Sequence, residues 1–163
     1  LFRAYDMPNP QLAMIEIAQF HKSKDNFIPS VAPGTCISQN PISSKIINDL
    51  TPGPDCINTA GCLFCKNHRD IDSADHVWSL VSYRHLKSIE LASFKINNLK
   101  NIKNPIEIII ERITEKLNYF ENSSEERKEW VKEALNKIDE GDYHIMWGGL
   151  IQLQELTGAN EDE

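Results

Sequence analysis

The 163-residue sequence has no long apolar run and no segment in which polar and apolar residues alternate. Its longest uninterrupted apolar stretch is Leu12-Ala13-Met14-Ile15, which is far too short to cross a bilayer, so no membrane partner is expected. Without alternating segments there is no signal for a β-sheet. Hydrophobic residues still make up 40% of the chain, which is ordinary for a protein with a folded core.

The sequence also lacks the motifs of several large enzyme classes. It has no glycine-rich phosphate loop, no His-Glu-x-x-His helix, no Gly-x-Ser-x-Gly turn, and no His-x-Glu of the kind a zinc deaminase needs. The histidines are scattered, and His76 and His85 lie nine residues apart instead of on one helical face. We therefore predict no catalytic residue, no enzyme activity and no small-molecule substrate for this chain.

Positive charge is scarce as well. Residues 71–163 carry 11 Lys+Arg against 18 Asp+Glu, which accounts for the whole chain's net charge of −7. A protein whose main task is to grip phosphates would be basic, so DNA is expected to be at most a weak partner. One group of basic residues is a candidate DNA contact, and its members are Arg84, Lys87, Lys95, Lys100 and Lys103. The simpler interpretation is that these residues belong to a solvated helix end and loop.

Cysteine is rare but clustered, since all four copies lie within the first 65 residues: Cys36, Cys56, Cys62 and Cys65. The pair Cys62-x-x-Cys65 follows Gly61, and such a turn directs two sulfurs at one ion. Structural zinc takes four ligands, and four cysteines supply that number with none left for catalysis. The sequence predicts a closed zinc site made by these four residues, with His68 in place of Cys36 or Cys56 as an alternative.

Three other interpretations of the cysteines remain open. Two disulfides are compatible with the even count, although no secretory signal is visible. A thioredoxin-like redox pair would follow a strand at a helix start, whereas Cys62 follows a loop rich in Gly, Pro and Asp. Four unrelated buried cysteines would not be expected to cluster among Pro and Gly residues.

Helical periodicity and capping residues define the rest of the chain. Asn-Pro and Ser/Asp starts predict helices over about 10–22, 41–50, 72–96, 104–120, 124–140 and 143–156. The predicted fold class is all-α, with about five to six helices and a zinc-pinned irregular loop region. The expected divisions are an N-terminal helix plus zinc-binding loops over 1–70, a helical bundle over 71–156 and an acidic tail over 157–163. These divisions are expected to form one compact unit that is a fragment of a larger chain.

Several short motifs of the loop region resemble those of a known family. They are Gly34-Thr35-Cys36, Asp55-Cys56, Gly61 to Cys65, and the Leu80-x-Ser82-x-Arg84 pattern on the following helix. This order resembles the cysteine-rich region downstream of the catalytic domain in bacterial phage-integrase-type (tyrosine) recombinases of mobile elements. The likeness covers roughly residues 34–84.

The resemblance implies a DNA recombination or integration context and a cytoplasmic bacterial protein. It does not imply catalysis by this chain, because that family needs a His-x-x-Arg box and a nucleophilic tyrosine, and no His-x-x-Arg occurs here. The expected function is thus a non-catalytic, zinc-stabilised accessory domain that contacts protein, including a second copy, or DNA. A thiol or zinc redox sensor, or an interaction module unrelated to recombination, is the alternative.

Overall fold

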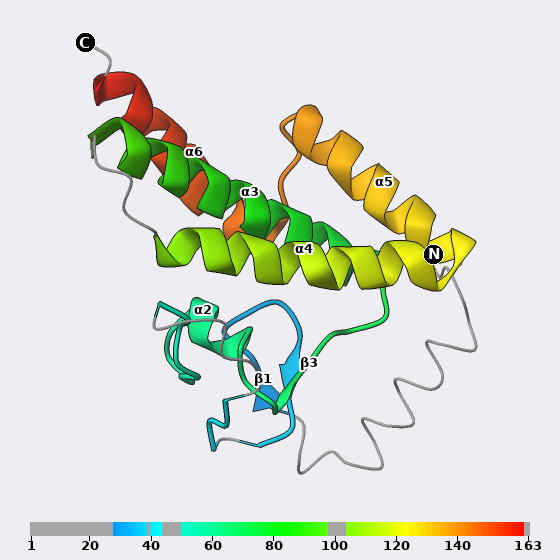
Figure 1. The fold of residues 1–163 in the computed structure, drawn as a ribbon. Helices are drawn as coiled ribbons and strands as arrows, with labels where there is room; N and C mark the ends of the chain where they lie inside the picture. The colour runs from blue at the N-terminus through cyan, green and yellow to red at the C-terminus, as the bar shows by residue number, and fades with distance from the viewer. Residues whose placement is uncertain (1–27, 39, 44–49, 98–103, 162–163) are drawn as a thin grey trace. The chain divides into compact units, whose positions relative to one another are not determined.

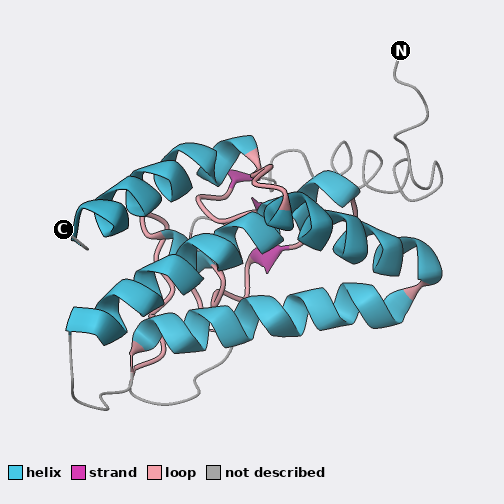
Figure 2. Ribbon diagram, turned by 90° about the horizontal axis from the view of Figure 1, so that it is seen from above, coloured by secondary structure: helices cyan, strands magenta, loops and turns pink. Residues whose placement is uncertain are grey.

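The computed structural model describes residues 28–38, 40–43, 50–97 and 104–161, and these fall into two compact units. Unit 1 takes the described residues from 28 to 43 and from 52 to 76, and unit 2 takes 50–51 and 77–161. The division falls after residue 76, within a helix, and not at residue 70 where the sequence had suggested it. Figure 2 shows that helices dominate the described part and that the strands are short. The predicted helix over about 10–22 lies outside the described residues.

Unit 1 is built from loops held by three two-residue strands and one short helix (Figure 1). Strand β2 (Thr35–Cys36) lies between β1 (Ile28–Pro29) and β3 (His68–Arg69), and both pairings are antiparallel. Helix α2 (Thr59–Cys62) lies between β2 and β3 in the order of the chain. Sequence patterns did not predict these strands, because two residues are too few to show alternation.

The helix predicted over 41–50 does not begin where the Asn40-Pro41 pair suggested. Residues 41 and 42 are irregular, and Ser43 forms an isolated antiparallel bridge with Cys65. The Lys66 amide also donates to the Ile42 carbonyl, at 2.7 Å. Pairing with the cysteine turn therefore takes the place of a helical first turn here, and residues 44–49 lie outside the described part.

Unit 2 contains four long helices, which agrees with the predicted all-α class. They are α3 (Ala74–Asn97), whose first turn belongs to unit 1, α4 (Pro105–Ser123), α5 (Glu125–Asp139) and α6 (Ile145–Glu161). All four correspond to predicted helices. However, α6 continues through Thr157 to Glu161, so it ends later than the predicted helix over about 143–156. No helix in the described ranges is long and apolar enough to cross a membrane.

The predicted caps explain where these helices begin and end. The Asn104 side chain accepts from the Ile106 amide at 3.0 Å, and Ser124 accepts from the Arg127 amide at 3.1 Å, so each satisfies an otherwise unbonded N–H of a first turn. At the end of α5, Gly141 adopts φ +80° and its amide bonds to the Ile138 carbonyl. A left-handed residue at this position closes the helix with the hydrogen bonds of a Schellman motif.

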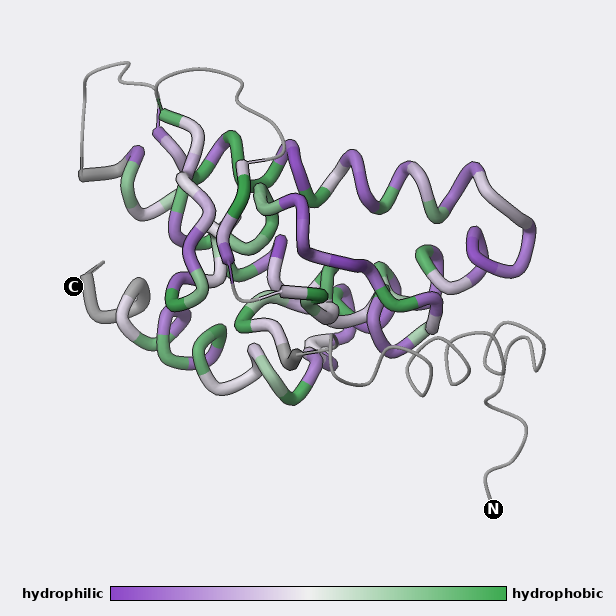
Figure 3. The backbone as a smooth tube through the Cα atoms, turned by 90° about the horizontal axis from the view of Figure 1, so that it is seen from below, coloured by the Kyte–Doolittle hydropathy of each residue, from purple (hydrophilic) through white to green (hydrophobic). Residues whose placement is uncertain are grey.

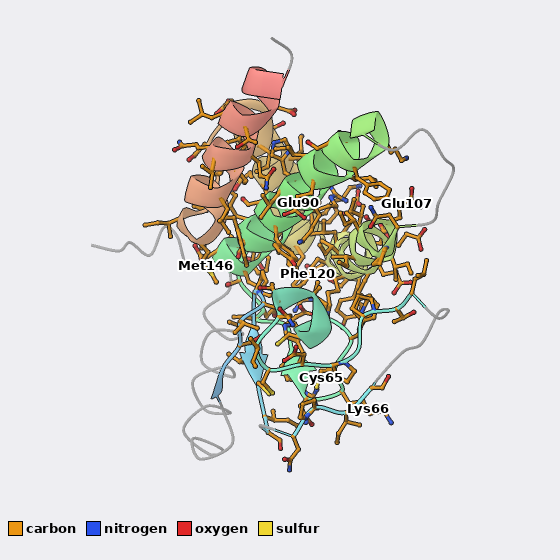
Figure 4. The ribbon with its side chains drawn as sticks, turned by 90° about the vertical axis from the view of Figure 1, so that its left-hand side faces the viewer. Cys65, Lys66, Glu90, Glu107, Phe120 and Met146 are labelled. Carbon is orange, nitrogen blue, oxygen red and sulfur yellow. The ribbon has the colours of Figure 1, made fainter. Side chains whose placement is uncertain are left out.

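The core of unit 2 consists of apolar side chains from all four helices. Helix α4 contributes the most regular stripe, because its buried residues recur every three or four positions. The buried apolar residues are Val77, Leu80, Val81, Tyr83, Leu86, Ile108, Ile109, Ile113, Leu117, Phe120, Trp130, Val131, Ala134, Trp147 and Ile151. Figure 4 labels Phe120 on α4 among these side chains.

Two buried serines on α3 bond to the start of α6. Ser82, which is fully buried, accepts a hydrogen bond from the His144 amide at 3.0 Å, and Ser79 accepts from the Trp147 indole N–H at 2.9 Å. The Trp147 ring also packs on Tyr83, with centroids 4.5 Å apart. These bonds satisfy donors that would otherwise be buried without a partner, so they fix where α6 begins against α3.

Replacing Ser82 with Ala should destabilise unit 2 by about 1–3 kcal/mol, because the buried His144 amide would lose its acceptor. Urea unfolding followed by tryptophan fluorescence measures this, since Trp78, Trp130 and Trp147 all belong to unit 2. Ser88→Ala is the matched control on the same helix, because Ser88 is exposed and bonds only within the helix. Equal unfolding free energies for the two variants would show that the Ser82 bond contributes nothing.

Candidate metal centre

The four cysteines come from four different local structures of unit 1. Cys36 ends β2, Cys56 lies in the bend before α2, Cys62 ends α2, and Cys65 forms the bridge with Ser43. All four are thiols, and none is joined in a disulfide. Figure 4 labels Cys65 and its neighbour Lys66 in this loop-rich unit.

The four sulfurs lie in one electrostatic neighbourhood. Desolvation raises the pKa of Cys56 from its ordinary value, and the charges of Cys36, Cys62, Cys65 and Asp55 raise it further. Cys56 is an exposed residue. The contributions of Cys36, Cys62 and Cys65 to its pKa indicate that the other three thiols lie near it. A thiolate at Cys56 is disfavoured because neighbouring like charges oppose it.

Hydrogen bonds show how three of the four sulfurs are held. The amides of Ile42 and Asn67 donate to the Cys65 sulfur, at 3.5 and 3.4 Å. The other two bonds run the opposite way, from Cys36 to the Ser38 carbonyl at 2.7 Å and from Cys62 to the Asp55 carbonyl at 3.5 Å. Within the described residues, no three His, Cys, Asp or Glu side chains are positioned to hold a metal ion. The thiols are thus neighbours, but they do not form a coordination sphere.

Gly61 allows the segment that carries Cys56 to approach α2. A Cβ at position 61 would lie 2.6 Å from the Gly53 carbonyl oxygen and 2.8 Å from the Asp55 amide nitrogen, which backbone atoms do not tolerate. The Asp55 carboxylate orders the same loop, because it accepts from the Ile57 amide at 2.7 Å and from the Asn58 side chain at 2.5 Å. Gly61 is therefore required for the close packing of this loop, in addition to preceding the Cys-x-x-Cys turn.

Gly34 has a comparable role before Cys36. Its φ of +120° lies in a region that residues with a Cβ rarely adopt, and a Cβ there would overlap the Arg69 carbonyl and the His68 ring. This glycine lets the loop before β2 turn tightly beside β3. Within the sequence motif Gly34-Thr35-Cys36, the glycine is thus explained by steric constraints on its backbone and on its missing side chain.

His68, the alternative ligand, is held by a hydrogen bond instead. It lies directly opposite Cys36 in the β2–β3 pairing and is buried, and its Nε2 donates to the Pro33 carbonyl at 2.6 Å. His76 is similarly engaged with Asp70, at 3.0 Å. Because the His68 Nε2 already has an acceptor, the bond supports a structural role for this ring.

The basic candidates that fall in the described residues are occupied by neighbours within unit 2. Arg84 is half-buried, donates to Thr114 at 3.2 Å, and burial lowers the pKa of its guanidinium. Lys87 lies 2.9 Å from Glu90, and Lys95 lies 3.3 Å from Glu107. Lys100 and Lys103 lie outside the described residues. The Leu80-x-Ser82-x-Arg84 pattern therefore joins α3 to α6 and α4, an assignment that needed the tertiary contacts.

Comparison with protein-family models, with curated proteins and with solved structures yields no match to this chain.

Replacing Gly61 with Ala should destabilise the cysteine loops by about 1–3 kcal/mol, because the added methyl overlaps backbone atoms. Hydrogen exchange of segment 50–70 measures the opening free energy locally. Gly53→Ala is the matched control, since a Cβ at position 53 meets nothing within 4 Å. If Gly61→Ala and Gly53→Ala exchange alike, the close approach at Gly61 is not needed.

Proposed function

We propose that this chain is a non-catalytic accessory module of an integrase-like recombination protein, whose loop-rich unit is stabilised by zinc bound to Cys36, Cys56, Cys62 and Cys65. The observation that supports the proposal is that Cys36, Cys62 and Cys65 lie near enough to Cys56 to raise its pKa, although they come from separate segments of unit 1. Among the described residues of unit 1, the buried apolar side chains are chiefly Leu63, Phe64 and Ala32. A small unit of this kind commonly depends on a metal for stability.

Zinc would supply four bonds that replace a larger hydrophobic core, and its charge would convert the opposition among the thiolates into attraction. Cys65 is already prepared for this by its two amide donors, whereas Cys36 and Cys62 would give up their S–H bonds to carbonyls. With all four positions taken by cysteine, no site remains for a reactive water. This supports a structural role over a catalytic one.

Zinc content tests the metal assignment. We expect one zinc per chain by elemental analysis of protein kept reduced, and release of that zinc should expose four thiols to titration with a chromogenic disulfide. Removing the metal with a chelator should raise hydrogen exchange in unit 1 while α4 and α5 keep their protection, because those helices bury their own apolar faces. Absence of zinc after refolding with excess metal would contradict the assignment.

Single substitutions distinguish a site of four cysteines from a site in which His68 replaces Cys36 or Cys56. Cys36→Ser and Cys56→Ser should each lower zinc affinity by at least about tenfold, since each removes one ligand. His68→Gln should retain the metal, because His68 bonds to Pro33 in this structure. Loss of zinc from His68→Gln with retention in either cysteine variant would establish the three-cysteine, one-histidine alternative.

The recombination context is supported by the motif order, and protein contact is supported over DNA contact by the charges. The chain's net charge is −7, and Arg84, Lys87 and Lys95 each contact a neighbour in their own unit. A phosphate would have to compete with those partners. We therefore assign the module chiefly to protein contact, with DNA as a weak secondary partner.

The redox-sensor alternative has less support. A redox-sensing cysteine needs a low pKa and exposure, so that its thiolate is present at neutral pH. Cys56 is the exposed member, but desolvation and its acidic neighbours raise its pKa. A raised pKa leaves less thiolate at Cys56, which counts against this residue as the sensing cysteine.

Duplex DNA binding by the chain should be weak, with Kd in the range of about 10⁻⁴–10⁻⁶ M, and should fall with added salt because only phosphate contacts are available. Fluorescence anisotropy of a labelled duplex across a salt series measures both the Kd and its dependence on salt concentration. Lys100→Ala/Lys103→Ala tests the group of basic residues, and Lys128→Ala/Lys132→Ala on α5 is the control of equal charge. Equal weakening by both pairs would show that the 84–103 segment is no DNA contact.

A further inference from the structure

Helix α6 is apolar on the face that it does not bury in unit 2. Trp147 and Ile151 are buried, whereas four large apolar side chains on other positions are about half exposed or more: Met146 49%, Leu150 50%, Leu153 58% and Leu156 65%. Figure 3 shows hydrophobic residues recurring along this helix toward the C-terminus, and Figure 4 labels Met146 at its start. A helix that is apolar all round is normally buried all round.

The exposed residues follow the spacing of a helix that pairs with another helix. Met146, Gly149, Leu153 and Leu156 are separated by three, four and three positions, which is the a/d pattern of a coiled-coil seam. We call these four residues, with Leu150 at their edge, the α6 seam. The occupant that fits such a seam is a second helix.

We propose that the occupant is the α6 seam of a second copy of this chain, packed antiparallel about a twofold axis. In that arrangement a positions face d positions, so Met146 lies opposite Leu156 of the partner copy and Leu153 lies opposite the partner's Gly149. A Cβ at Gly149 would meet nothing within 4 Å in the single chain, so this position is an open notch for a leucine. The seam is thereby complementary to itself, as an isologous interface requires.

Charge supports a second copy over a charged partner. Residues 145–160 contain no Lys or Arg and a single acid, Glu155. Helical geometry puts that residue on the side of α6 opposite Met146, and its carboxylate accepts from the Tyr143 hydroxyl at 3.0 Å. Two copies therefore bring no like charges together at the seam positions themselves, although Asp142 and Glu161 flank the seam and each chain carries −7.

The area is sufficient for a modest dimer. With Ile145 (90% exposed) at its margin, a twofold pair would bury on the order of 1,000 Å² in total, which is the lower limit for a specific interface. We expect a weak dimer, with a Kd on the order of micromolar, that dissociates on dilution.

Sedimentation equilibrium of the full chain under reducing conditions, over a range of concentrations, tests the proposal. We expect a reversible monomer–dimer equilibrium. Leu153→Glu should weaken it by at least about tenfold, because two carboxylates would enter the seam. Leu135→Glu, at a partly exposed leucine of α5, is the matched control and should leave the equilibrium unchanged.

The Gly149→Leu variant distinguishes dimerisation in the proposed register from nonspecific hydrophobic association. Leucine favours a helix more than glycine does, so the monomer should unfold at a higher urea concentration, yet the dimer should weaken because the notch for Leu153 is filled. A monomer at all concentrations would overturn the proposal, as would a Leu153→Glu variant that dimerises normally. A Gly149→Leu variant that dimerises more tightly would overturn the antiparallel register.

Discussion

Unit 1 depends on the close approach between Gly61 and the loop over residues 53–55. Without a side chain at position 61, the Gly53 carbonyl and the Asp55 amide can lie against α2, and the cysteine at position 56 is carried along with them. Asp55 then holds the loop through the Ile57 amide. The β2–β3 pairing brings Cys36 beside His68 by a separate route. Local sterics thus shape the loops that carry Cys36 and Cys56.

The two units reach stability by different physical means. In unit 2, amphipathic helices bury apolar stripes, and buried hydrogen bonds to Ser79 and Ser82 fix the start of α6. In unit 1, the described residues form short strands and turns that are joined by backbone pairing, and their buried apolar side chains include Leu63 and Phe64.

Basic residues on an acidic protein need not form a binding surface. Arg84 is half-buried against Thr114, and Lys87 and Lys95 lie beside Glu90 and Glu107 (Figure 4 labels both acids). Their spacing in the sequence suggested a stripe, whereas their neighbours show that each cation also has a local role. The α6 seam is the exposed apolar surface on which the proposed contact with a second copy rests.

The sequence by itself determined the four helices of unit 2, because capping residues such as Asn104 and Ser124 and the stripe on α4 act over a few positions along the chain. It also singled out the cysteines and Gly61 as a group. Only the tertiary structure decided what those residues meet: the strands that pair Cys36 with His68, the loss of a helical start at Pro41, and the partners of Ser82 and Arg84. The reason is physical, since these contacts join residues tens of positions apart, and no local propensity encodes which segment will lie opposite another.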